Sequence, residues 1–592
     1  MCGIAGEIAY AGVRADAAAV HAMTGTMADR GPDGSGFWSD GRVALGHRRL
    51  RIIDLSDAGA QPMEAPGLVV VFNGCIYNHR ELRAELADGF RFRSESDTEV
   101  ILAAYDRWGD AFAEHLVGMF AIVLVDRRRH RVVMARDRLG IKPLYLARLG
   151  GRIRFASTLP ALLAGGGIDT ELDPVALHHY LSWHSIVPAP RTLLRGVQKL
   201  PPATVRVIEA DGETADRVYW RPAYERDPQR ADWSPADWQD ALHDALLTAV
   251  RRRLVADVPV GVMLSGGLDS SLLVALLAEA GAEGVPTFSI GFEDAGDESG
   301  DEFAYSDVVA RSFATDHHRI RIPAAELRNA VQGTIRAMPE PMATQDVPAF
   351  FLLSQRIAQH VKVVQSGQGA DELFAGYRYH RPAAHVPRRD ALRAFEGAFT
   401  DRPHDRVMAM LRPDLRIPFD ASSELARAAF EAPGAETALD AVLRFDVHHL
   451  MVDDPVKRVD AMTMAWGLEA RVPFLDQDVV ALAASCPPGL KIAQDGKGVL
   501  KDLGRRMLPS ELIDRPKGYF PVPGLRHLDE PMRALLRDAL LSPDARTRAV
   551  LEPDVVHRLL DAPNHHYTPV GGNVLWQVGL LELWLREHGV GA

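Results

Sequence analysis

The second residue of the chain is a cysteine whose position could make it a nucleophile. The sequence opens Met1-Cys2-Gly3-Ile4, so removal of the initiator methionine would leave one residue that carries both a thiol and the α-amine. An α-amine titrates near pH ~8, and its neutral form can take the thiol proton, directly or through one water, to leave a thiolate. A cysteine at this position is more often accidental than catalytic, so the case depends on the other motifs.

A glycine-rich loop forms the strongest local signal. The run Leu264-Ser265-Gly266-Gly267-Leu268-Asp269-Ser270 joins an apolar strand-like segment to a long apolar helix. Glycines let backbone N–H groups close around phosphate oxygens, and the N-terminus of the helix adds a favourable dipole. The lysine of the nucleotide-kinase loop is absent, so the loop predicts a pyrophosphate cradle with Asp269 as a ligand to Mg²⁺. An ordinary glycine-rich turn is the alternative interpretation.

A second, acidic loop follows the apolar run 361–364. It reads Ser366-Gly367-Gln368-Gly369-Ala370-Asp371-Glu372 and would lie at the same carboxyl edge of a parallel sheet, where ligands of open α/β folds bind. Asp371 would then share the metal with Asp269. A solvated acidic turn is the plain alternative. Together the two loops predict a site that splits a nucleoside triphosphate between its α and β phosphates.

Composition excludes several classes of protein. The 592 residues carry a net charge of -12, which gives no general basic footprint and disfavours nucleic acid as an obligatory partner. Three scattered cysteines, Cys2, Cys75 and Cys486, are too few for a disulfide framework and fit a reducing cytosol. There is no charged-then-apolar leader and no apolar run near the ~20 residues that span a bilayer. We therefore expect a cytoplasmic protein without a membrane partner.

Four pairs of adjacent histidines begin at His178, His317, His448 and His565. Adjacent residues do not share one face of a helix, and no HExxH spacing occurs. These pairs are therefore not expected to bind a structural metal.

The elements that must position these residues differ between the two halves of the chain. Short strand-like runs divided by turns, with two helical stretches, predict an α+β sandwich near the N-terminus; the strands are expected at 43–45, 68–72, 120–125, 132–135, 152–155 and 205–208 and the helices at 80–88 and 97–108. The second half alternates apolar strands at 258–264, 287–291 and 361–364 with helices, including 238–254, 271–280 and 575–584. That alternation predicts a parallel sheet covered on both faces. The expected domains are 1–210 and 236–592, with a Pro-, Arg- and Asp-rich linker over 211–235.

These motifs together resemble the glutamine-dependent asparagine synthetase family over essentially the whole chain. Besides Cys2 and the two loops, the matching segments are His47-Arg48-Arg49-Leu50, Asn73-Gly74, Ile76-Tyr77-Asn78, Ser96-Asp97, 136–141 and Leu468-Glu469-Ala470-Arg471-Val472-Pro473-Phe474-Leu475-Asp476. The resemblance implies an N-terminal αββα sandwich of the N-terminal-nucleophile hydrolase type. A parallel-sheet α/β ATP-pyrophosphatase domain with additional helices would follow it.

The resemblance also implies roles in the first domain. Cys2 would attack the carboxamide of glutamine, and Asn73 and Gly74 would donate to the oxyanion of the tetrahedral intermediate. Arg49 would hold the substrate carboxylate through its planar fork, and Asp97 would hold its ammonium. The full glutamine-binding set that it implies is Arg49, Leu50, Arg51, Ile52, Ile53, Asn73, Gly74, Cys75 and Asp97.

In the second domain the resemblance implies an ATP site. Its expected residues are Leu264, Ser265, Gly266, Gly267, Asp269, Ser270, Ile290, Ser366 and Gly367. Lys497 would stabilise charge that develops on the phosphate during adenylation of a carboxylate, with Asp269 and Asp371 on Mg²⁺. Ammonia from glutamine would attack the acyl-adenylate to give an amide, AMP and pyrophosphate, after crossing a water-poor passage between the domains. The implied partners are small molecules, with a homodimer left open.

Two departures from the family pattern concern the substrates. Members that make asparagine usually read Asn-Gly-Glu and Ser-Gly-Glu-Gly where this chain has Cys75 and Gln368. Asp97 alone would then anchor the glutamine ammonium, with Cys75 as a packing residue. A glutamine amide at 368, facing the acceptor or intermediate, cannot act as a base near neutral pH. These features and Gly300-Asp301-Glu302-Phe303 resemble a branch that amidates N-acetylglutaminylglutamine, which leaves that dipeptide and aspartate as competing acceptors.

Two other classes of function also remain open. One is a glutaminase whose second domain is only structural, and the other is a non-catalytic nucleotide sensor. The retention of Asp269, Asp371 and Lys497 argues against the first, and an intact Cys2 with its expected partners argues against the second.

Overall fold

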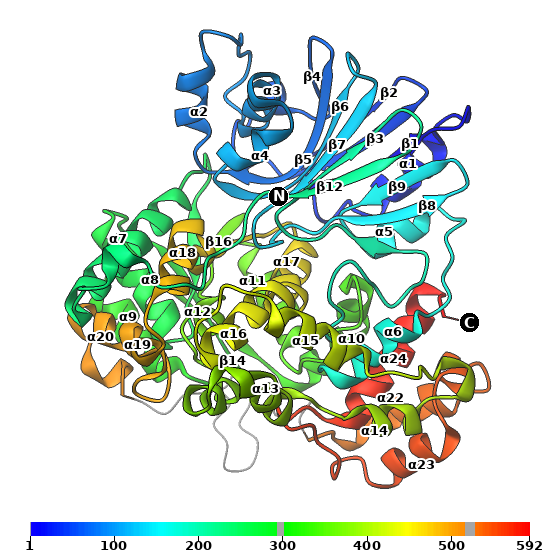
Figure 1. Ribbon diagram of the computed structural model, residues 1–592, viewed down its shortest axis with the longest axis vertical. Coiled ribbons are helices and arrows are strands. Elements are labelled where there is room, and N and C mark those ends of the chain that lie inside the picture. Colours follow the sequence, from blue (N-terminus) through cyan, green and yellow to red (C-terminus); the bar gives the residue numbers. More distant parts are fainter. Residues whose placement is uncertain (1, 293–300, 515–526, 592) are drawn as a thin grey trace.

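The N-terminal half contains two antiparallel sheets that lie face to face. The computed structural model describes residues 2–292, 301–514 and 527–591, and Figure 1 shows these sheets above a helix-rich C-terminal half. One sheet has the order β10-β8-β9-β1-β3-β2 and the other the order β12-β11-β7-β6-β5-β4. The strands of the first are β1 (Gly3–Ala9), β2 (Gly34–Ser39), β3 (Val43–Arg49), β8 (Tyr145–Leu149), β9 (Arg152–Ala156) and β10 (Gln198–Lys199). Those of the second are β4 (Met63–Ala65), β5 (Leu68–Ile76), β6 (Gly118–Asp126), β7 (Arg131–Arg136), β11 (Thr204–Ile208) and β12 (Thr214–Val218).

Alternation along the strands builds the layers of this half. Val69 and Val71 of β5 belong to the cluster between the sheets, whereas Val70 and Phe72 pack with the helices outside, as a period of two requires. Helices α2 (His79–Leu86), α3 (Asp97–Trp108) and α4 (Phe112–His115) cover this sheet, and α1 (Ala17–Gly25) and α5 (Leu159–Ala164) cover the other. The predicted αββα sandwich is confirmed.

Part of the segment expected as a linker is a strand. Residues 214–218 form β12, which pairs antiparallel with β11 from Thr204↔Val218 to Ile208↔Thr214. The N-terminal sheet therefore extends to Val218. The sequence did not indicate this strand, because β12 is an edge strand with little buried apolar surface.

The C-terminal half is built on a five-stranded parallel sheet of order β15-β14-β13-β16-β17. Its strands are β13 (Val260–Met263), β14 (Pro286–Phe292), β15 (Asp316–Ile322), β16 (Val363–Gln365) and β17 (Glu469–Arg471). Apolar helices cover both faces, which confirms the predicted α/β architecture. Neither β15 nor β17 was expected, because β15 is rich in His and Arg and β17 has only three residues.

Helices make up most of the remainder of this half. They are α7 (Pro235–Arg252), α8 (Leu268–Glu279), α9 (Phe303–Ser312), α10 (Ala324–Ala337), α11 (Val347–Ile357), α12 (Ala370–Leu373), α13 (Ala391–Phe399), α14 (His404–Met410), α15 (Ala421–Glu431), α16 (Ala438–Phe445), α17 (Lys457–Met464), α18 (Gln477–Ser485), α19 (Pro488–Ile492), α20 (Gly498–Met507), α22 (Glu530–Leu541), α23 (Pro553–Asp561) and α24 (Val574–His588). α7 begins with a capping box between Ser234 and Asp237. The predicted helices at 238–254, 271–280 and 575–584 correspond to α7, α8 and α24.

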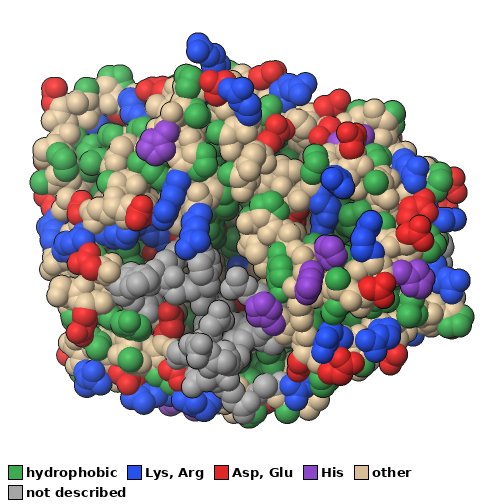
Figure 2. Space-filling view, turned by 90° about the horizontal axis from the view of Figure 1, so that it is seen from below, with side chains coloured by type: hydrophobic (Ala, Val, Ile, Leu, Met, Phe, Trp, Pro, Cys, Tyr) green, Lys and Arg blue, Asp and Glu red, His purple; other side chains and the backbone are tan. Residues whose placement is uncertain are grey.

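The two halves share a core. Helix α6 (Pro174–Ser182) lies among C-terminal helices, beside α24 in Figure 1, and Tyr180 and Gln577 exchange two hydrogen bonds of 2.9 and 3.0 Å. Figure 2 shows basic, acidic and hydrophobic side chains mixed over the face seen from below. Within the described ranges, no helix combines the length and apolar character needed to cross a membrane.

Candidate active sites

The candidate nucleophile, Cys2, lies directly before β1 and is buried. Its backbone nitrogen donates to Asn73 Oδ1 at 3.1 Å, and Arg30 Nε lies 3.5 Å from its carbonyl oxygen. Burial raises the pKa of the Cys2 thiol, against the opposing effects of the chain's amino terminus, the Leu50 backbone and Arg49. The thiol therefore needs a base to become a thiolate. Met1 lies outside the described residues, so the free α-amine stays a prediction.

Asn73 and Gly74 have the properties expected of oxyanion donors. Asn73 is fully buried, and its Nδ2 has no hydrogen-bond partner among the described residues. A buried donor without a partner is costly, and a developing oxyanion would satisfy it. A Cβ at Gly74 would lie 2.0 Å from the carbonyl oxygen of Met119, so only glycine fits at this point of β5.

A pocket with about 370 Å³ of empty space surrounds Cys2. It brings Cys2 together with seven of the nine predicted glutamine-binding residues, which are Arg49, Leu50, Ile52, Ile53, Gly74, Cys75 and Asp97. Arg49 is held by the carbonyls of Ser56 and Asp54, and Asp97, the first residue of α3, accepts from the Ile76 nitrogen at 3.0 Å. Arg51 does not line the pocket, because its guanidinium pairs with Asp57 at 2.7 Å near the surface.

The charge of Asp97 is sensitive to its surroundings. Burial raises the pKa of this carboxyl, while His79 and the Ile76 nitrogen oppose that shift. The surroundings of Asp97 therefore do not by themselves keep its carboxyl group ionised. Cys75 is also buried, and burial raises the pKa of its thiol, which agrees with the packing role expected for it.

Two charged residues of this pocket were missed by the sequence analysis. Glu469 and Arg471 of β17 line it together with Cys2 and Asp97, although about 400 residues separate them in the chain. Arg471 Nε donates to Glu469 Oε1 at 2.6 Å, and Arg471 Nη2 lies 3.6 Å from the Cys75 sulfur. Both belong to the motif 468–476, but nothing in its local pattern indicates that it reaches the first domain.

The predicted phosphate loop follows β13 and leads into α8. Gly266 adopts a φ of +71°, and a Cβ there would lie 2.6 Å from the Ser306 nitrogen, so the turn requires glycine. Ser265 and Ser270 close the loop through their hydroxyls, 3.1 Å apart. Gly267 precedes the first turn of α8 without a side-chain cap, which leaves the N-terminus of this helix accessible to an anion.

Lys497 joins the two predicted loops. Its Nζ lies 2.6 Å from Asp269 Oδ2 and 2.8 Å from Asp371 Oδ1. Burial alone would lower the pKa of this lysine, but the two carboxylates raise it above its ordinary value. A Cβ at Gly376 would lie 2.0 Å from Asp371 Oδ1 and 2.4 Å from Lys497 Cε, so a further glycine, absent from the predicted set, leaves room for this ion-pair triad.

The other residues predicted for the nucleotide lie on the same edge of the sheet. β13 is hydrogen-bonded to both β14 and β16, which places Ile290 and the loop at Ser366 on either side of Leu264. Gly367 lies against Asp269, since its Cβ would meet that residue's Cβ at 3.0 Å. Gln368 is half-buried in the following turn. Gly300 of the segment 300–303 lies outside the described residues.

The carboxylates of this edge suit a divalent cation. Asp269 and Asp371 come from different loops and approach one position, which Lys497 Nζ occupies. Carboxylate oxygens next to phosphate-binding backbone are the donor set that Mg²⁺ prefers. The residues present therefore fit the predicted ion.

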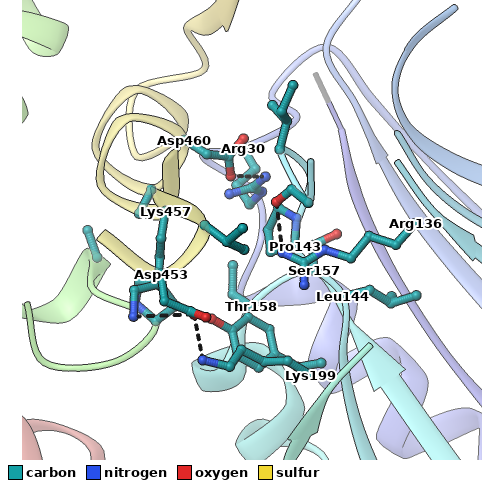
Figure 3. Close-up of a pocket in the computed structure, with 17 residues that line it drawn as sticks. Arg30, Arg136, Pro143, Leu144, Ser157, Thr158, Lys199, Asp453, Lys457 and Asp460 are labelled. Carbon is teal, nitrogen blue, oxygen red and sulfur yellow. Dashed lines mark hydrogen bonds and ion pairs between the residues drawn. The ribbon is translucent and has the colours of Figure 1, made fainter. Parts of the chain in front are cut away.

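A second pocket, with about 460 Å³ of empty space, lies between the halves of the chain (Figure 3). Arg30, which contacts Cys2, lines it and pairs with Asp460 at 3.1 Å. On its other side Lys199 pairs with Asp453 at 2.6 Å. The charges of this interface are thus neutralised by partners from the opposite half.

One histidine of the four adjacent pairs joins a cluster that the sequence did not indicate. His178 Nε2 lies 3.1 Å from His404 Nδ1 and 3.7 Å from Asp420 Oδ1, and its Nδ1 contacts the Ser422 hydroxyl at 2.9 Å. Asp420 also caps α15 by accepting from the Ser423 nitrogen. Each ring nitrogen of His178 thus has a hydrogen-bond partner. The cluster is explained as a packing contact that joins α6, α14 and α15.

Two family models match the chain. A glutamine amidotransferase domain covers residues 1–220 and places the first half in that class. Asparagine synthase covers residues 241–586. The chain belongs to the asparagine synthase family, which confirms the resemblance inferred from its motifs and the prediction of a ligase with a glutamine amidotransferase domain.

Curated relatives extend this similarity over most of the chain. Asparagine synthetase [glutamine-hydrolyzing] 1 of Bacillus subtilis is 30% identical over 95% of this chain and 92% of its own length. Asparagine synthetase [glutamine-hydrolyzing] 3 of the same organism is 29% identical over 88% of this chain and 87% of its own. Asparagine synthetase B [glutamine-hydrolyzing] of Escherichia coli is 30% identical over 83% of this chain and 77% of its own.

Proposed function

We propose that the protein is a glutamine-dependent amide ligase that consumes ATP and releases AMP and pyrophosphate. The observation that carries this proposal is the contact of Lys497 with both Asp269 and Asp371. A glutaminase with a merely structural second half would not need a buried lysine between two carboxylates beside a phosphate-type loop. The names of the relatives support the same activity.

The first half-reaction uses the pocket around Cys2. The sulfur attacks the carboxamide carbon of glutamine, and Asn73 Nδ2 and the Gly74 amide donate to the oxyanion. The α-amine of Cys2 takes the thiol proton and passes it to the leaving ammonia. Water then hydrolyses the thioester, which releases glutamate and the free thiol. Arg49 holds the substrate carboxylate during both steps.

The second half-reaction uses the carboxyl edge of the parallel sheet. An oxygen of the acceptor carboxylate attacks the α-phosphorus of ATP, and pyrophosphate leaves against the loop 265–270 and the N-terminus of α8. Lys497 stabilises the charge that develops on the phosphate. Asp269 and Asp371 would hold Mg²⁺, which neutralises phosphate charge when bound. Ammonia attacks the acyl-adenylate carbonyl, and AMP leaves with the amide formed.

Aspartate is the acceptor that the relatives' names support. One observation favours a second acceptor, the dipeptide N-acetylglutaminylglutamine: Gln368 lies in the turn after Gly367, where an amide replaces the carboxylate usual in members that make asparagine. A neutral side chain suits an acceptor that carries no ammonium near this turn. We also propose a cytoplasmic location, which the three free cysteines support.

Exchange of labelled pyrophosphate into ATP tests the proposal. Exchange that depends on a carboxylate is expected with aspartate or with N-acetylglutaminylglutamine, and the same compound should yield its amide when glutamine is added. The absence of exchange with both compounds and with a broad panel of amino acids and dipeptides would contradict the ligase function. Release of ADP and orthophosphate in place of AMP would contradict the mechanism.

A further inference from the structure

The pocket around Cys2 contains a carboxylate that comes from the other half of the molecule. Glu469 of β17 lines this pocket with Asp97, Arg49 and Cys2 and is 1% exposed. Within the N-terminal half the pocket offers one carboxylate, Asp97, because position 75 is a cysteine. An amino-acid substrate is a zwitterion, so its ammonium needs anionic partners once it leaves water.

We propose that Glu469 binds the α-ammonium of the amino-acid amide substrate together with Asp97, so that two carboxylates serve this site although position 75 is a cysteine. This proposal rests on the glutaminase half of the proposed function. It assigns a substrate contact to a residue of the C-terminal half. The glutamine site is thus incomplete without that half.

The surroundings of Cys75 explain why the carboxylate can come from β17. Arg471 Nη2 lies 3.6 Å from the Cys75 sulfur, while Arg471 Nε donates to Glu469 Oε1 at 2.6 Å. A carboxylate at position 75 would therefore lie beside the same guanidinium. In this structure Arg471 pairs with Glu469, which lines the same pocket.

The backbone around β17 fixes Glu469 in place. Arg471 Nη1 donates to the carbonyls of Arg253 and Val255 at 2.9 and 2.8 Å, and the Glu469 nitrogen donates to the Lys362 carbonyl at 2.8 Å. A carboxylate held by a rigid strand loses little entropy when it binds an ammonium. The pKa shifts of the two carboxyls agree with this assignment. Burial opposes ionisation of Glu469, but the chain's amino terminus and Arg471 lower its pKa. Burial raises the pKa of Asp97.

The test compares glutamine with 4-carbamoylbutanoate, which is glutamine without its α-amino group. Hydrolysis of both compounds is measured in the full-length enzyme, and the ratio of their kcat/KM values reports the ammonium contact. In Glu469→Gln we expect this ratio to fall by about tenfold to a hundredfold, mainly through KM for glutamine, because a hydrogen bond to a charged group is lost. Synthesis of the amide from free ammonium should remain and would show that the fold is intact.

Glu340→Gln is the matched control. Glu340 is also a buried glutamate of the interface between the halves, paired with Lys199 at 3.1 Å, but it does not line the pocket around Cys2. Its replacement should change the rates for both compounds alike and leave their ratio unchanged. An unchanged ratio in Glu469→Gln would overturn the proposal, because a structural role alone would affect both compounds equally.

A second variant covers the case in which Glu469→Gln does not fold. In Asp97→Asn, discrimination against 4-carbamoylbutanoate should fall but persist, since Glu469 remains. Complete loss of discrimination in Asp97→Asn would assign the whole contact to Asp97 and overturn the proposal. If the unmodified enzyme hydrolyses neither compound, the proposed glutaminase function itself fails, which is a separate outcome from either of these.

Discussion

The amide nitrogen of Ser366 donates a hydrogen bond to the carbonyl oxygen of Arg471 at 2.8 Å. Ser366 begins the acidic loop of the candidate nucleotide site, and the guanidinium of Arg471 lies in the pocket around Cys2. One residue of β17 thus contacts both candidate sites, through its backbone on one side and its side chain on the other. A displacement of the loop at Ser366 would act directly on the wall of the glutamine pocket.

The two sites should nevertheless be separable by mutation of the nucleophile. Cys2→Ala removes the attacking sulfur, so amide synthesis from glutamine should fall by about 10³-fold or more. Synthesis from free ammonium should persist, because Cys2 makes no contact with Lys497 or the loop 265–270. Product assays with glutamine and with ammonium measure the two activities. Loss of both activities in a folded variant would contradict the two-site scheme.

The oxyanion role of Asn73 can be separated from its contact with Cys2. Asn73→Asp keeps the oxygen that accepts from the Cys2 nitrogen at 3.1 Å but loses the Nδ2 donor. We expect kcat for glutamine hydrolysis to fall by about 10²–10³-fold with a small change in KM. In Asn73→Ala, kcat should fall by the same factor. Near-normal turnover in Asn73→Asp would show that Nδ2 does not stabilise the intermediate.

Replacement of Lys497 should affect the synthetase reaction alone. In Lys497→Met the two carboxylates face each other without their shared cation, and charge on the phosphate loses its donor. Pyrophosphate exchange should fall by about 10²-fold or more, whereas glutamine hydrolysis should change little. Lys501→Met is the matched control, because Lys501 lies one helical turn later and its Nζ donates to the Gln494 carbonyl rather than to Asp269 or Asp371. Equal losses in both variants would contradict the assigned role.

The buried carboxyl of Glu372 should make the stability of the folded protein depend on pH. Burial, followed by the charges of Asp446 and Asp371, raises its pKa to about 8. The folded state therefore keeps a proton that the unfolded state releases above its ordinary pKa near ~4.5. Stability from this group is present in full at low pH and is lost as the pH rises through about 8.

The measurement compares the free energy of unfolding at pH 6 and pH 9. The unmodified protein should lose roughly 3 kcal/mol more over this range than Glu372→Gln, which cannot ionise. Tyr377 donates to Glu372 Oε1 at 2.8 Å, and the carboxamide oxygen of glutamine can accept the same bond. Parallel pH profiles for the two proteins would show that Glu372 has no raised pKa.

Local patterns predicted much of the fold and part of each site. The continuous apolar runs 68–72 and 120–125 predicted β5 and β6, and the Gly-rich run with a following apolar helix predicted β13 and α8. The polar β15 and the three-residue β17 carry no such pattern, since their pairing with β14 and β16 is what makes them strands. Glu469 and Arg471 were missed for the same reason, because their contact with the N-terminal half arises only when β17 joins the sheet.

Arg51 is a predicted residue that does not line the pocket. The family resemblance placed it in the glutamine-binding set with its neighbours Leu50 and Ile52, which do line the pocket. Its own side chain points to Asp57 and the Leu55 carbonyl near the surface. The contact of Arg51 with glutamine therefore stays a prediction, and its guanidinium does not support it in this structure.

Gly376 provides a steric test of the ion-pair triad. A Cβ there would approach Asp371 Oδ1 to 2.0 Å and Lys497 Cε to 2.4 Å, so Gly376→Ala must displace one of the two. We expect pyrophosphate exchange to fall by about tenfold or more, since a displacement of 1 Å at reacting groups can cost that much. Gly397→Ala in α13, where a Cβ meets nothing within 4 Å, should leave exchange unchanged and raise stability by up to ~1 kcal/mol. Normal exchange in Gly376→Ala would mean that the contact of Lys497 with Asp371 is not required for adenylation.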